Sequence, residues 1–284
     1  MWERFFESEI MKFLDEDQMK NHLDLLLNHP NNLVSCHLKI KSDAMISGIP
    51  FFIQVFNLLQ PHIKNESLDK LRSYEGKKVK KGDEIKFMLP FNVALTGERV
   101  ALNLLQHCSS ITTWTHSFVE LAEQKNISIL DTRKTTPGLR AFEKYAVKIG
   151  GGSNHRSSLQ DAFMIKDNQK NCFGSLENAV KFYRDLRQFY RPIIVEIHHL
   201  SELQEAINLN IQHVMLDNFT PVKIKEALKF KKEGMTFEVS GGVNKENISD
   251  YFIEGVDAIS IGALTHSVPH LDFSLKMFPL KSDL

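Results

Sequence analysis

The sequence is poor in cysteine, and its cysteines are far apart. Cys36, Cys108 and Cys172 are the only three in 284 residues. They form neither the closely spaced pairs of a zinc site nor the dense set of a disulfide framework. Isolated thiols are typical of a protein in a reducing compartment, so we expect all three to be buried and unpaired.

An excess of charge and a long hydrophobic run are also missing. The 35 Lys and Arg balance 35 Asp and Glu, whereas proteins that bind nucleic acids or membrane surfaces usually carry a basic excess. The most apolar stretch, residues 49–59, is broken by Gln54 and Asn57 and is too short to span a bilayer. No basic segment followed by an apolar one opens the chain. The sequence therefore predicts a cytoplasmic protein that binds neither nucleic acid nor membrane.

What the sequence does contain is enough apolar material for one or two folded domains. Hydrophobic residues make up 42% and charged residues 25% of the chain, which is typical of globular proteins. In the first part we expect helices over 3–27 and 49–60, hairpin-like strands within 75–89, and a long helix over 98–124. Paired Ser and Thr residues within 109–113 predict a kink in that long helix.

Beyond residue 125 the pattern changes to short apolar runs that end in polar residues. Six such runs occupy 128–134, 162–168, 193–197, 213–218, 237–242 and 258–263. Helical patterns lie between them, and strands that alternate with helices indicate a parallel sheet covered by helices. We therefore predict an α/β barrel with six or seven strands in place of the usual eight. An open doubly wound sheet is the alternative.

Helix-start signals fall between these predicted strands. Ser201 with Gln204 resembles a capping box. Thr220 precedes Pro221, which suits the first position of a helix. Asn244 is placed to cap a helix over the residues that follow it.

The predicted strands end in side chains that suit chemistry. In parallel α/β folds the functional groups lie at the carboxyl ends of the strands. These ends carry Thr132, Arg133, Lys134, Lys166, Asp167, Asn168, Glu196, Asp217, Asn218, Ser240, Gly241, Gly242, Gly262 and Ala263. Six polar or glycine-containing ends in succession indicate one shared site.

Basic residues are concentrated in one segment of this neutral chain. Residues 132–170 contain eight Lys or Arg against three acidic residues. Cations gathered at a barrel mouth indicate a small polyanionic ligand, and Arg suits carboxylate or phosphate groups. We expect Arg133, Lys134, Arg156 and Lys166 to bind it.

Two carboxylates and three glycine clusters complete the pattern. Glu196 and Asp217 suit Mg²⁺, which takes few protein oxygens and bridges to phosphates; alternatively, they only balance the basic cluster. The glycine-containing turns within 240–247 and 261–267 can bind phosphate through backbone amides. The glycines of GGGSNHR (150–156) are expected to turn His155 and Arg156 toward the pocket.

The run DTRKTTPGLRAFEKYAVKIGGGSNHR, followed by IKDN, VEI, MLDN, SGGVN and IGALTHS, closely resembles the quinolinate phosphoribosyltransferases. The resemblance covers roughly residues 45–278. It implies an N-terminal α/β sandwich domain over 1–110, with the tail 266–284 packing back on it, and an incomplete α/β barrel over 111–265. It also implies a reaction of de novo NAD synthesis. Phosphoribosyl pyrophosphate and quinolinate yield nicotinate mononucleotide, pyrophosphate and CO₂, with Mg²⁺ as cofactor.

The resemblance also implies roles for individual residues. Lys134 and Lys166 would lie between the two substrates, and Glu196 and Asp217 would bind the ribose hydroxyls and the Mg²⁺–pyrophosphate. The remaining substrate-binding residues would be Arg99, Thr132, Arg133, His155 and Arg156, with Ser240, Gly241, Gly242, Ile261, Gly262, Ala263 and His266 around the phosphates. The family assembles as a homodimer, or as a hexamer built from dimers, in which the arginine matching Arg99 comes from the neighbouring subunit.

Three other functions remain open from the residues alone. One is a related phosphoribosyltransferase acting on nicotinate or another small acid, including the type associated with molybdate transport. The others are an aldolase-type barrel, with Lys134 or Lys166 forming a Schiff base, and a non-catalytic binding module. The chain also departs from the family's pattern, with SSITT at 109–113 in place of SGIAT, Ser158 in place of glycine, and Gln169 in place of histidine.

Overall fold

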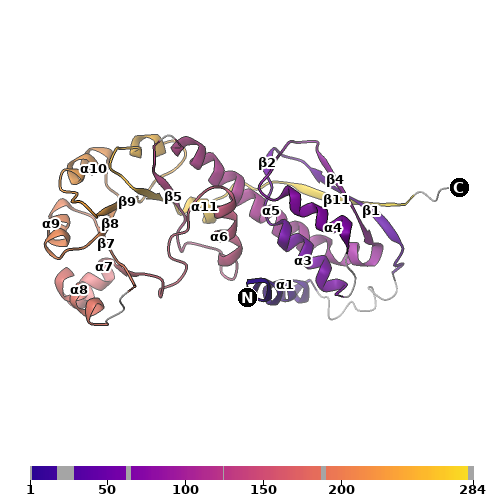
Figure 1. Ribbon diagram of the computed structural model, residues 1–284, viewed down its shortest axis with the longest axis horizontal. Helices are drawn as coiled ribbons and strands as arrows, with labels where there is room; N and C mark the ends of the chain where they lie inside the picture. Colours follow the sequence, from indigo (N-terminus) through magenta and orange to yellow (C-terminus); the bar gives the residue numbers. More distant parts are fainter. Residues whose placement is uncertain (1, 18–28, 62–64, 124, 187–189, 281–284) are drawn as a thin grey trace. The chain divides into compact units, whose positions relative to one another are not determined.

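The computed structural model describes residues 2–17, 29–61, 65–123, 125–186 and 190–280 (Figure 1). The chain divides into two compact units, Met1–Trp114 with Val268–Leu284, and Thr115–Ser267. Helix α5 (Phe91–Ala122) contributes to both units. In the described part of the chain, no helix has both the length and the apolar character needed to cross a membrane.

A three-stranded antiparallel sheet forms the centre of the first unit. Its order is β11-β1-β4, with β1 at Leu33–Ile40, β4 at Glu84–Pro90 and β11 at Phe273–Pro279. The C-terminal strand thus pairs with an N-terminal one. Side chains alternate between a buried and an outward face, as strand geometry requires. Leu38 and Phe87 are buried, whereas Lys39 and Lys86 are exposed.

The helices of the first unit are α1 (Trp2–Glu16), α3 (Ile49–Leu59), α4 (Glu66–Asp69) and the 3₁₀ helix η2 (Lys70–Tyr74). The predicted helix over 49–60 is confirmed. The one over 3–27 is confirmed as far as Glu16, and residues 18–28 of that prediction lie outside the described residues. Helix α3 packs on the sheet, because the rings of Phe52 and Phe56 lie 5.7 and 6.4 Å from that of Phe87.

The hairpin predicted within 75–89 is wrong. Strand β3 (Lys78–Val79) pairs with β2 (Ala44–Met45), and β4 pairs with β1. The turn itself is where the glycines indicated it, since Gly82 has a φ of 97°. The apolar side chains that alternate along β4 find a much longer partner in β1 than the two-residue β3 offers. Cross-strand packing therefore decides the pairing.

Helix α5 begins at Phe91, earlier than the predicted residue 98, and runs through residues 109–113 without interruption. The hydroxyls there bind a neighbouring segment. Ser109 Oγ accepts from the amide of Ser47 (3.0 Å), and Thr113 Oγ1 accepts from that of Met45 (2.9 Å). The side chains of Ser47 and Thr112 also share a hydrogen bond of 2.6 Å. The Ser and Thr side chains of this stretch therefore hold residues 45–47 against α5 by hydrogen bonds.

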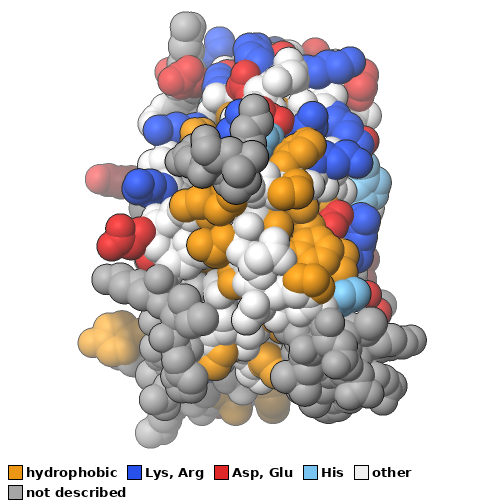
Figure 2. Space-filling view, turned by 90° about the vertical axis from the view of Figure 1, so that its right-hand side faces the viewer, with side chains coloured by type: hydrophobic (Ala, Val, Ile, Leu, Met, Phe, Trp, Pro, Cys, Tyr) orange, Lys and Arg blue, Asp and Glu red, His pale blue; other side chains and the backbone are white. Residues whose placement is uncertain are grey.

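The outward face of the antiparallel sheet is mixed in character. Glu84 forms ion pairs with His37 (3.1 Å) and Lys86 (3.3 Å). Exposed hydrophobic side chains lie on the same three strands, at Leu33, Met88 and Phe278. Figure 2 shows the first unit from the right-hand side of Figure 1. Hydrophobic side chains gather near the middle of the view, and charged ones lie mostly toward its upper part.

A six-stranded parallel sheet forms the second unit, and all six predicted strands are present. They are β5 (Ser128–Leu130), β6 (Phe163–Ile165), β7 (Ile193–Ile197), β8 (His213–Asp217), β9 (Thr236–Ser240) and β10 (Ala258–Ser260). Their order is β5-β10-β9-β8-β7-β6. The edge strands β5 and β6 do not pair with each other in the described chain, so the barrel is incomplete, as predicted (Figure 1).

The helices of this unit are α6 (Arg140–Ile149), α7 (Asp167–Phe173), α8 (Leu176–Asp185), α9 (Leu200–Asn208), α10 (Pro221–Leu228), the 3₁₀ helix η3 (Ile248–Tyr251) and α11 (Ala263–His266). The cap at Thr220 is confirmed. The capping box at Ser201 is wrong, because α9 already begins at Leu200 and Glu202 accepts from the preceding amides. Asn244 caps a turn before η3, not an α-helix.

The expectation that all cysteines are buried is wrong for one of them. Cys36 and Cys108 are buried, and Cys172 is exposed. None of these three cysteines forms a disulfide. Cys172 lies in α7, a helix with no buried residue, which explains why it faces solvent.

Candidate active site

Two neighbouring strands supply the carboxylates of the site. Glu196 lies in β7 and is 7% exposed, and Asp217 ends β8. The two strands pair in parallel, with Ile197 opposite Leu216, so their carboxyl ends meet as predicted. Lys166 follows β6 directly, and its ammonium forms an ion pair with Glu196 Oε2. The structure thus brings together three of the residues that the sequence singled out.

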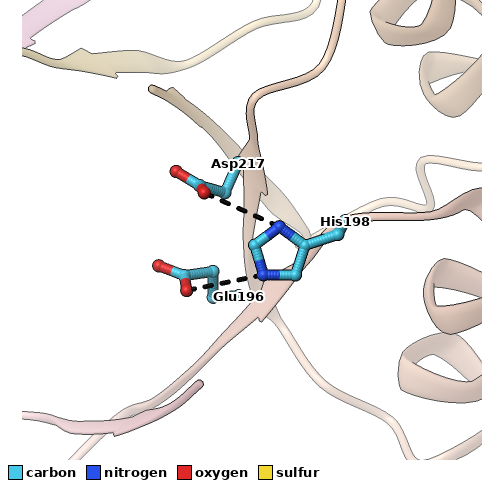
Figure 3. A group of neighbouring side chains, drawn as sticks. All are labelled: Glu196, His198 and Asp217. Carbon is cyan, nitrogen blue, oxygen red and sulfur yellow. Dashed lines mark ion pairs between the residues drawn. The ribbon is translucent and has the colours of Figure 1, made fainter. Parts of the chain in front are cut away.

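His198 belongs to the same cluster, and sequence reasoning missed it. Its Nδ1 lies 3.6 Å from Asp217 Oδ2, and its Nε2 lies 3.8 Å from Glu196 Oε1 (Figure 3). One ligand atom from each of these three residues lies within 4.8 Å of the others, which is compact enough to hold a metal ion. His198 is the first polar residue after the apolar run 193–197, so the rule that selected the other strand ends also applies to it.

A lysine and a carboxylate hold the loop that carries His198. Glu202 accepts hydrogen bonds from the amides of His198 (2.6 Å) and His199 (3.2 Å), and Lys170 donates to Glu202 (2.6 Å). Burial raises the pKa of Glu202, but the hydrogen bonds from Lys170 and the two amides outweigh it, so this pKa lies below its ordinary value. Glu202 is therefore ionised and holds the backbone amides of His198 and His199 in place.

Two arginines of the sequence-predicted set, Arg133 and Arg156, lie close enough for their charges to interact. Burial lowers the pKa of Arg156, and the charge of Arg133 lowers it further. Neither guanidinium forms an ion pair with a carboxylate in the described chain. Arg133 Nε is buried and has no hydrogen-bond partner among the described residues. Two close cations with free donor capacity favour an anionic ligand.

A buried ion pair anchors His155. Lys144 Nζ lies 2.5 Å from Asp131 Oδ1, and their side chains are 5% and 0% exposed. Asp131 accepts a hydrogen bond from the amide of His155 (2.8 Å), and Lys144 donates one to the backbone carbonyl of His155 (2.8 Å). His155 Nδ1 accepts from the amide of Arg156 (2.7 Å), so the ring proton lies on Nε2, which faces Glu238 Oε2 at 3.3 Å.

This arrangement corrects the view of Lys144 as one of the cations at the barrel mouth. It lies in α6 and is buried, and its charge is used within the fold. Sequence reasoning also missed Asp131 and Glu238. A signal existed for Glu238, because a carboxylate within a buried strand needs a partner. The pairing of Asp131 with Lys144, by contrast, depends on how a helix packs beside a strand.

The glycine turns approach other functional residues closely. Gly241 has a φ of 92°, and a Cβ there would lie 2.3 Å from Asn218 Oδ1, so only glycine fits. A Cβ on Gly262 would lie 3.2 Å from Lys134 Cδ and 2.8 Å from His266 Nε2. The Lys134 side chain thus lies against the turn that begins α11.

Several backbone groups of these turns have free hydrogen-bonding capacity. The amides of Gly241, Gly242 and Gly262 donate to no acceptor in the described ranges. The amide of Ile261, in contrast, donates to the carbonyl of Leu130 (2.9 Å), so it is used within the sheet. Ala263 begins α11, and Ser240 ends β9.

The other predicted residues are placed as follows. Thr132 Oγ1 accepts from the amide of Lys134 (3.0 Å). His266 Nδ1 shares a hydrogen bond of 2.7 Å with Ser267 Oγ. Arg99 is an exposed residue of α5 in the first unit. Gln169, one of the departures from the family pattern, accepts from the amide of Lys166 (3.1 Å).

Comparison with known proteins agrees with this geometry. The model of the quinolinate phosphoribosyl transferase N-terminal domain matches residues 22–109, and that of the C-terminal domain matches residues 111–276. The chain belongs to the quinolinate phosphoribosyltransferase family. Both of the family's domains are therefore present, and they meet within α5.

Curated relatives and solved structures agree with this assignment. The chain is 39% identical over 244 residues to a probable nicotinate-nucleotide pyrophosphorylase [carboxylating] of Bacillus subtilis, covering 85% of this chain and 83% of the relative. It is 37% identical to the nicotinate-nucleotide pyrophosphorylase [carboxylating] of Rattus norvegicus, covering 84% and 80%. The crystal structure of NadC from Streptococcus pyogenes matches with a TM-score of 0.86 at 33% identity, over 96% of this chain and 97% of that one.

Proposed function

We propose that this chain catalyses the transfer of a phosphoribosyl group from phosphoribosyl pyrophosphate to quinolinate. The products are nicotinate mononucleotide, pyrophosphate and CO₂, in de novo NAD biosynthesis. The observation that carries this proposal is the pair of arginines, Arg133 and Arg156, whose charges interact and which form no ion pair with a carboxylate in the described chain; the charge of Glu196 also acts on Arg156. Three cysteines that form no disulfide fit a cytoplasmic location.

The cationic half of the site would hold the pyridine dicarboxylate. Arg133 and Arg156 supply planar donors that suit two carboxylates. His155 is fixed at both its amide and its carbonyl, and its Nε2 faces Glu238 Oε2 at 3.3 Å, so the ring is held in one orientation beside Arg156. A dianion matches this number of cations better than a monocarboxylate does.

Lys134 and Lys166 would act on the charge that changes during the reaction. Lys134 lies against the turn at Gly262, and Lys166 forms an ion pair with Glu196. When the ring nitrogen attacks C1′ of the ribose, the bond from C1′ to the pyrophosphate oxygen breaks. The 2-carboxylate then leaves as CO₂, its electron pair remains on C2 of the ring, and that carbon takes up a proton to give nicotinate mononucleotide. A nearby ammonium stabilises that developing charge, and no covalent nucleophile is needed.

Glu196 and Asp217 would hold Mg²⁺. Their oxygens suit a hard cation, and Glu196 Oε1 is available because Lys166 contacts Oε2. When bound, Mg²⁺ would neutralise the pyrophosphate leaving group. The free amides of Gly241, Gly242 and Gly262 would bind phosphate oxygens, with Ser240 and Ala263 beside them. We expect EDTA to abolish activity and added Mg²⁺ to restore it; full activity in EDTA would contradict the metal role.

We also propose a homodimer, or a hexamer of dimers, in which Arg99 completes the site of the neighbouring subunit. The test mixes two inactive variants, Arg99→Ala and Lys134→Ala, under conditions that exchange subunits. In a mixed dimer one site carries both changes and the other carries neither. About a quarter of wild-type activity should therefore return if a two-fold interface shares the sites. No recovery, with exchange confirmed by tagged subunits, would show that Arg99 acts in its own chain.

The direct test of the proposed reaction is product analysis. The purified chain is incubated with quinolinate, phosphoribosyl pyrophosphate and Mg²⁺, and nicotinate mononucleotide is measured by mass spectrometry. Omission of each substrate in turn is the control. Absence of the product, with a folded protein and a positive control enzyme in the same assay, would refute the proposal.

A further inference from the structure

The carboxylate half of the site contains an imidazole, which a plain magnesium site does not need. His198 lies between Glu196 and Asp217, with ring nitrogens 3.8 and 3.6 Å from their nearest oxygens (Figure 3). Bonds of about 2.0–2.2 Å from one ion to nitrogen and oxygen ligands keep neighbouring ligand atoms ~3 Å apart. These three side chains therefore need to move only slightly closer together to bind an ion.

The ring of His198 is not already satisfied by the protein. Its Nδ1 makes no hydrogen bond within the described chain, and Asp217 Oδ2 lies 3.6 Å from it. Asp167 Oδ2 lies 3.1 Å from the other ring nitrogen, Nε2, so a carboxylate is present to orient the ring. A carboxylate behind a histidine is the usual support of a metal-bound imidazole.

The surrounding residues keep the ligand atoms in place. Lys166 holds Glu196 through Oε2 and leaves Oε1 facing the ring. Asn218 donates to Asp217 Oδ2 (2.7 Å), and Glu202 fixes the amide of His198 (2.6 Å). Each of the three proposed ligands is therefore oriented by a neighbouring residue.

We infer that His198 joins Glu196 and Asp217 as a metal ligand and makes this a mixed nitrogen–oxygen site, selective for a first-row transition ion over Mg²⁺. Imidazole suits Co²⁺ and Zn²⁺, whereas carboxylate and water suffice for Mg²⁺. The inference rests on the metal role proposed above for Glu196 and Asp217. It does not depend on quinolinate being the substrate.

The test measures metal binding by calorimetry on the full chain without substrates, so it is independent of catalysis. Co²⁺ and Mg²⁺ are titrated into the wild type, His198→Ala, His198→Asp and His199→Ala. His199 is the matched control, because it is the adjacent histidine, is exposed and lies outside the cluster. Thermal unfolding of each variant shows that it is folded.

We expect His198→Ala to weaken Co²⁺ binding by about tenfold or more, with Mg²⁺ binding changed less than twofold and His199→Ala like the wild type. His198→Asp should retain Mg²⁺ binding and lose the preference for Co²⁺. Pulsed electron paramagnetic resonance of bound Mn²⁺ should show coupling to nitrogen in the wild type only. Equal Co²⁺ affinity in the wild type and His198→Ala, or no nitrogen coupling, would overturn the inference. In that case product formation with Mg²⁺ would leave the proposed function intact.

Discussion

Two of the lysine–carboxylate pairs in the second unit, Lys144–Asp131 and Lys166–Glu196, differ mainly in exposure. Lys144 and Asp131 are 5% and 0% exposed, and they hold the backbone of His155 from both sides. The side chains of Lys166 and Glu196 are 45% and 9% exposed, and they lie at strand ends next to the residues proposed to hold a metal ion. Asp131, Lys166 and Glu196 lie at or next to the ends of barrel strands and Lys144 lies in α6, yet only the second pair is open to a ligand.

The comparison teaches how one chemical pair serves two purposes. A buried pair has no water to replace a lost partner, so removing one member leaves an uncompensated charge. An open pair loses little stability when it is broken, because water and salt screen it. Its lysine is therefore available to respond to a substrate whose charge changes.

The largest expected effect is on the buried pair. Lys144→Ala should lower the free energy of unfolding by about 3–5 kcal/mol, since it leaves the Asp131 carboxylate buried and unpaired. Denaturant titration measures this change. Lys166→Ala serves as the open counterpart and should cost about 1 kcal/mol or less. Equal losses in the two variants would break the distinction between the pairs.

The next effect concerns catalysis at the open pair. Lys166→Ala and Lys134→Ala should each lower kcat by about 10²–10³-fold, because an ammonium that acts on developing charge contributes in the transition state. Steady-state kinetics with both substrates gives kcat and KM separately. If only KM rises, these lysines bind substrate without aiding the chemical step.

A smaller effect is expected at the carboxylate beside that pair. Asp217→Asn keeps the shape of the side chain and removes a charge from the metal cluster. We expect the Mg²⁺ concentration for half-maximal activity to rise by about tenfold, in line with the loss of a well-held oxygen ligand. Asp250→Asn, on η3 and outside the metal cluster, is the control. An unchanged Mg²⁺ requirement in Asp217→Asn would assign this carboxylate a structural role.

The smallest effect extends the contrast between buried and open groups to the cysteines. Burial raises the pKa of the Cys36 thiol to about 12, and the charge of Glu98 raises it too. We expect a thiol reagent at neutral pH to label Cys172 in the native protein and to leave Cys36 and Cys108 unlabelled. Peptide mass spectrometry locates the label. Rapid labelling of Cys36 in the native protein would contradict its burial.

Much of the second unit could be predicted because parallel strands are buried on both faces. Each then appears as a short apolar run, and its polar end marks the site. The same rule includes His198, which directly follows the run 193–197. The pairing of Asp131 with Lys144 was beyond local reasoning, because it depends on α6 packing beside β5.

The first unit was harder to predict because packing overrides local signals there. Gly97 lies inside α5, although glycine usually weakens a helix. A Cβ at this position would lie 2.7 Å from the ring of Phe56, so glycine permits α3 and α5 to pack closely. Likewise, β4 takes β1 as its partner because of the side chains that both strands bury.

The most direct test of the central claim compares quinolinate with nicotinate as acceptors. The charges of Arg133 and Arg156 interact, neither forms an ion pair with a carboxylate of the described chain, and Arg133 Nε has no hydrogen-bond partner there; we assign this donor capacity to two substrate carboxylates. The kcat/KM of the wild-type chain is measured for each acid with phosphoribosyl pyrophosphate and Mg²⁺, and CO₂ release is followed with carboxyl-labelled quinolinate. The account predicts turnover of quinolinate with one CO₂ per nicotinate mononucleotide, and a kcat/KM for nicotinate lower by at least about 10²-fold. Equal turnover of nicotinate, or product without CO₂, would contradict it.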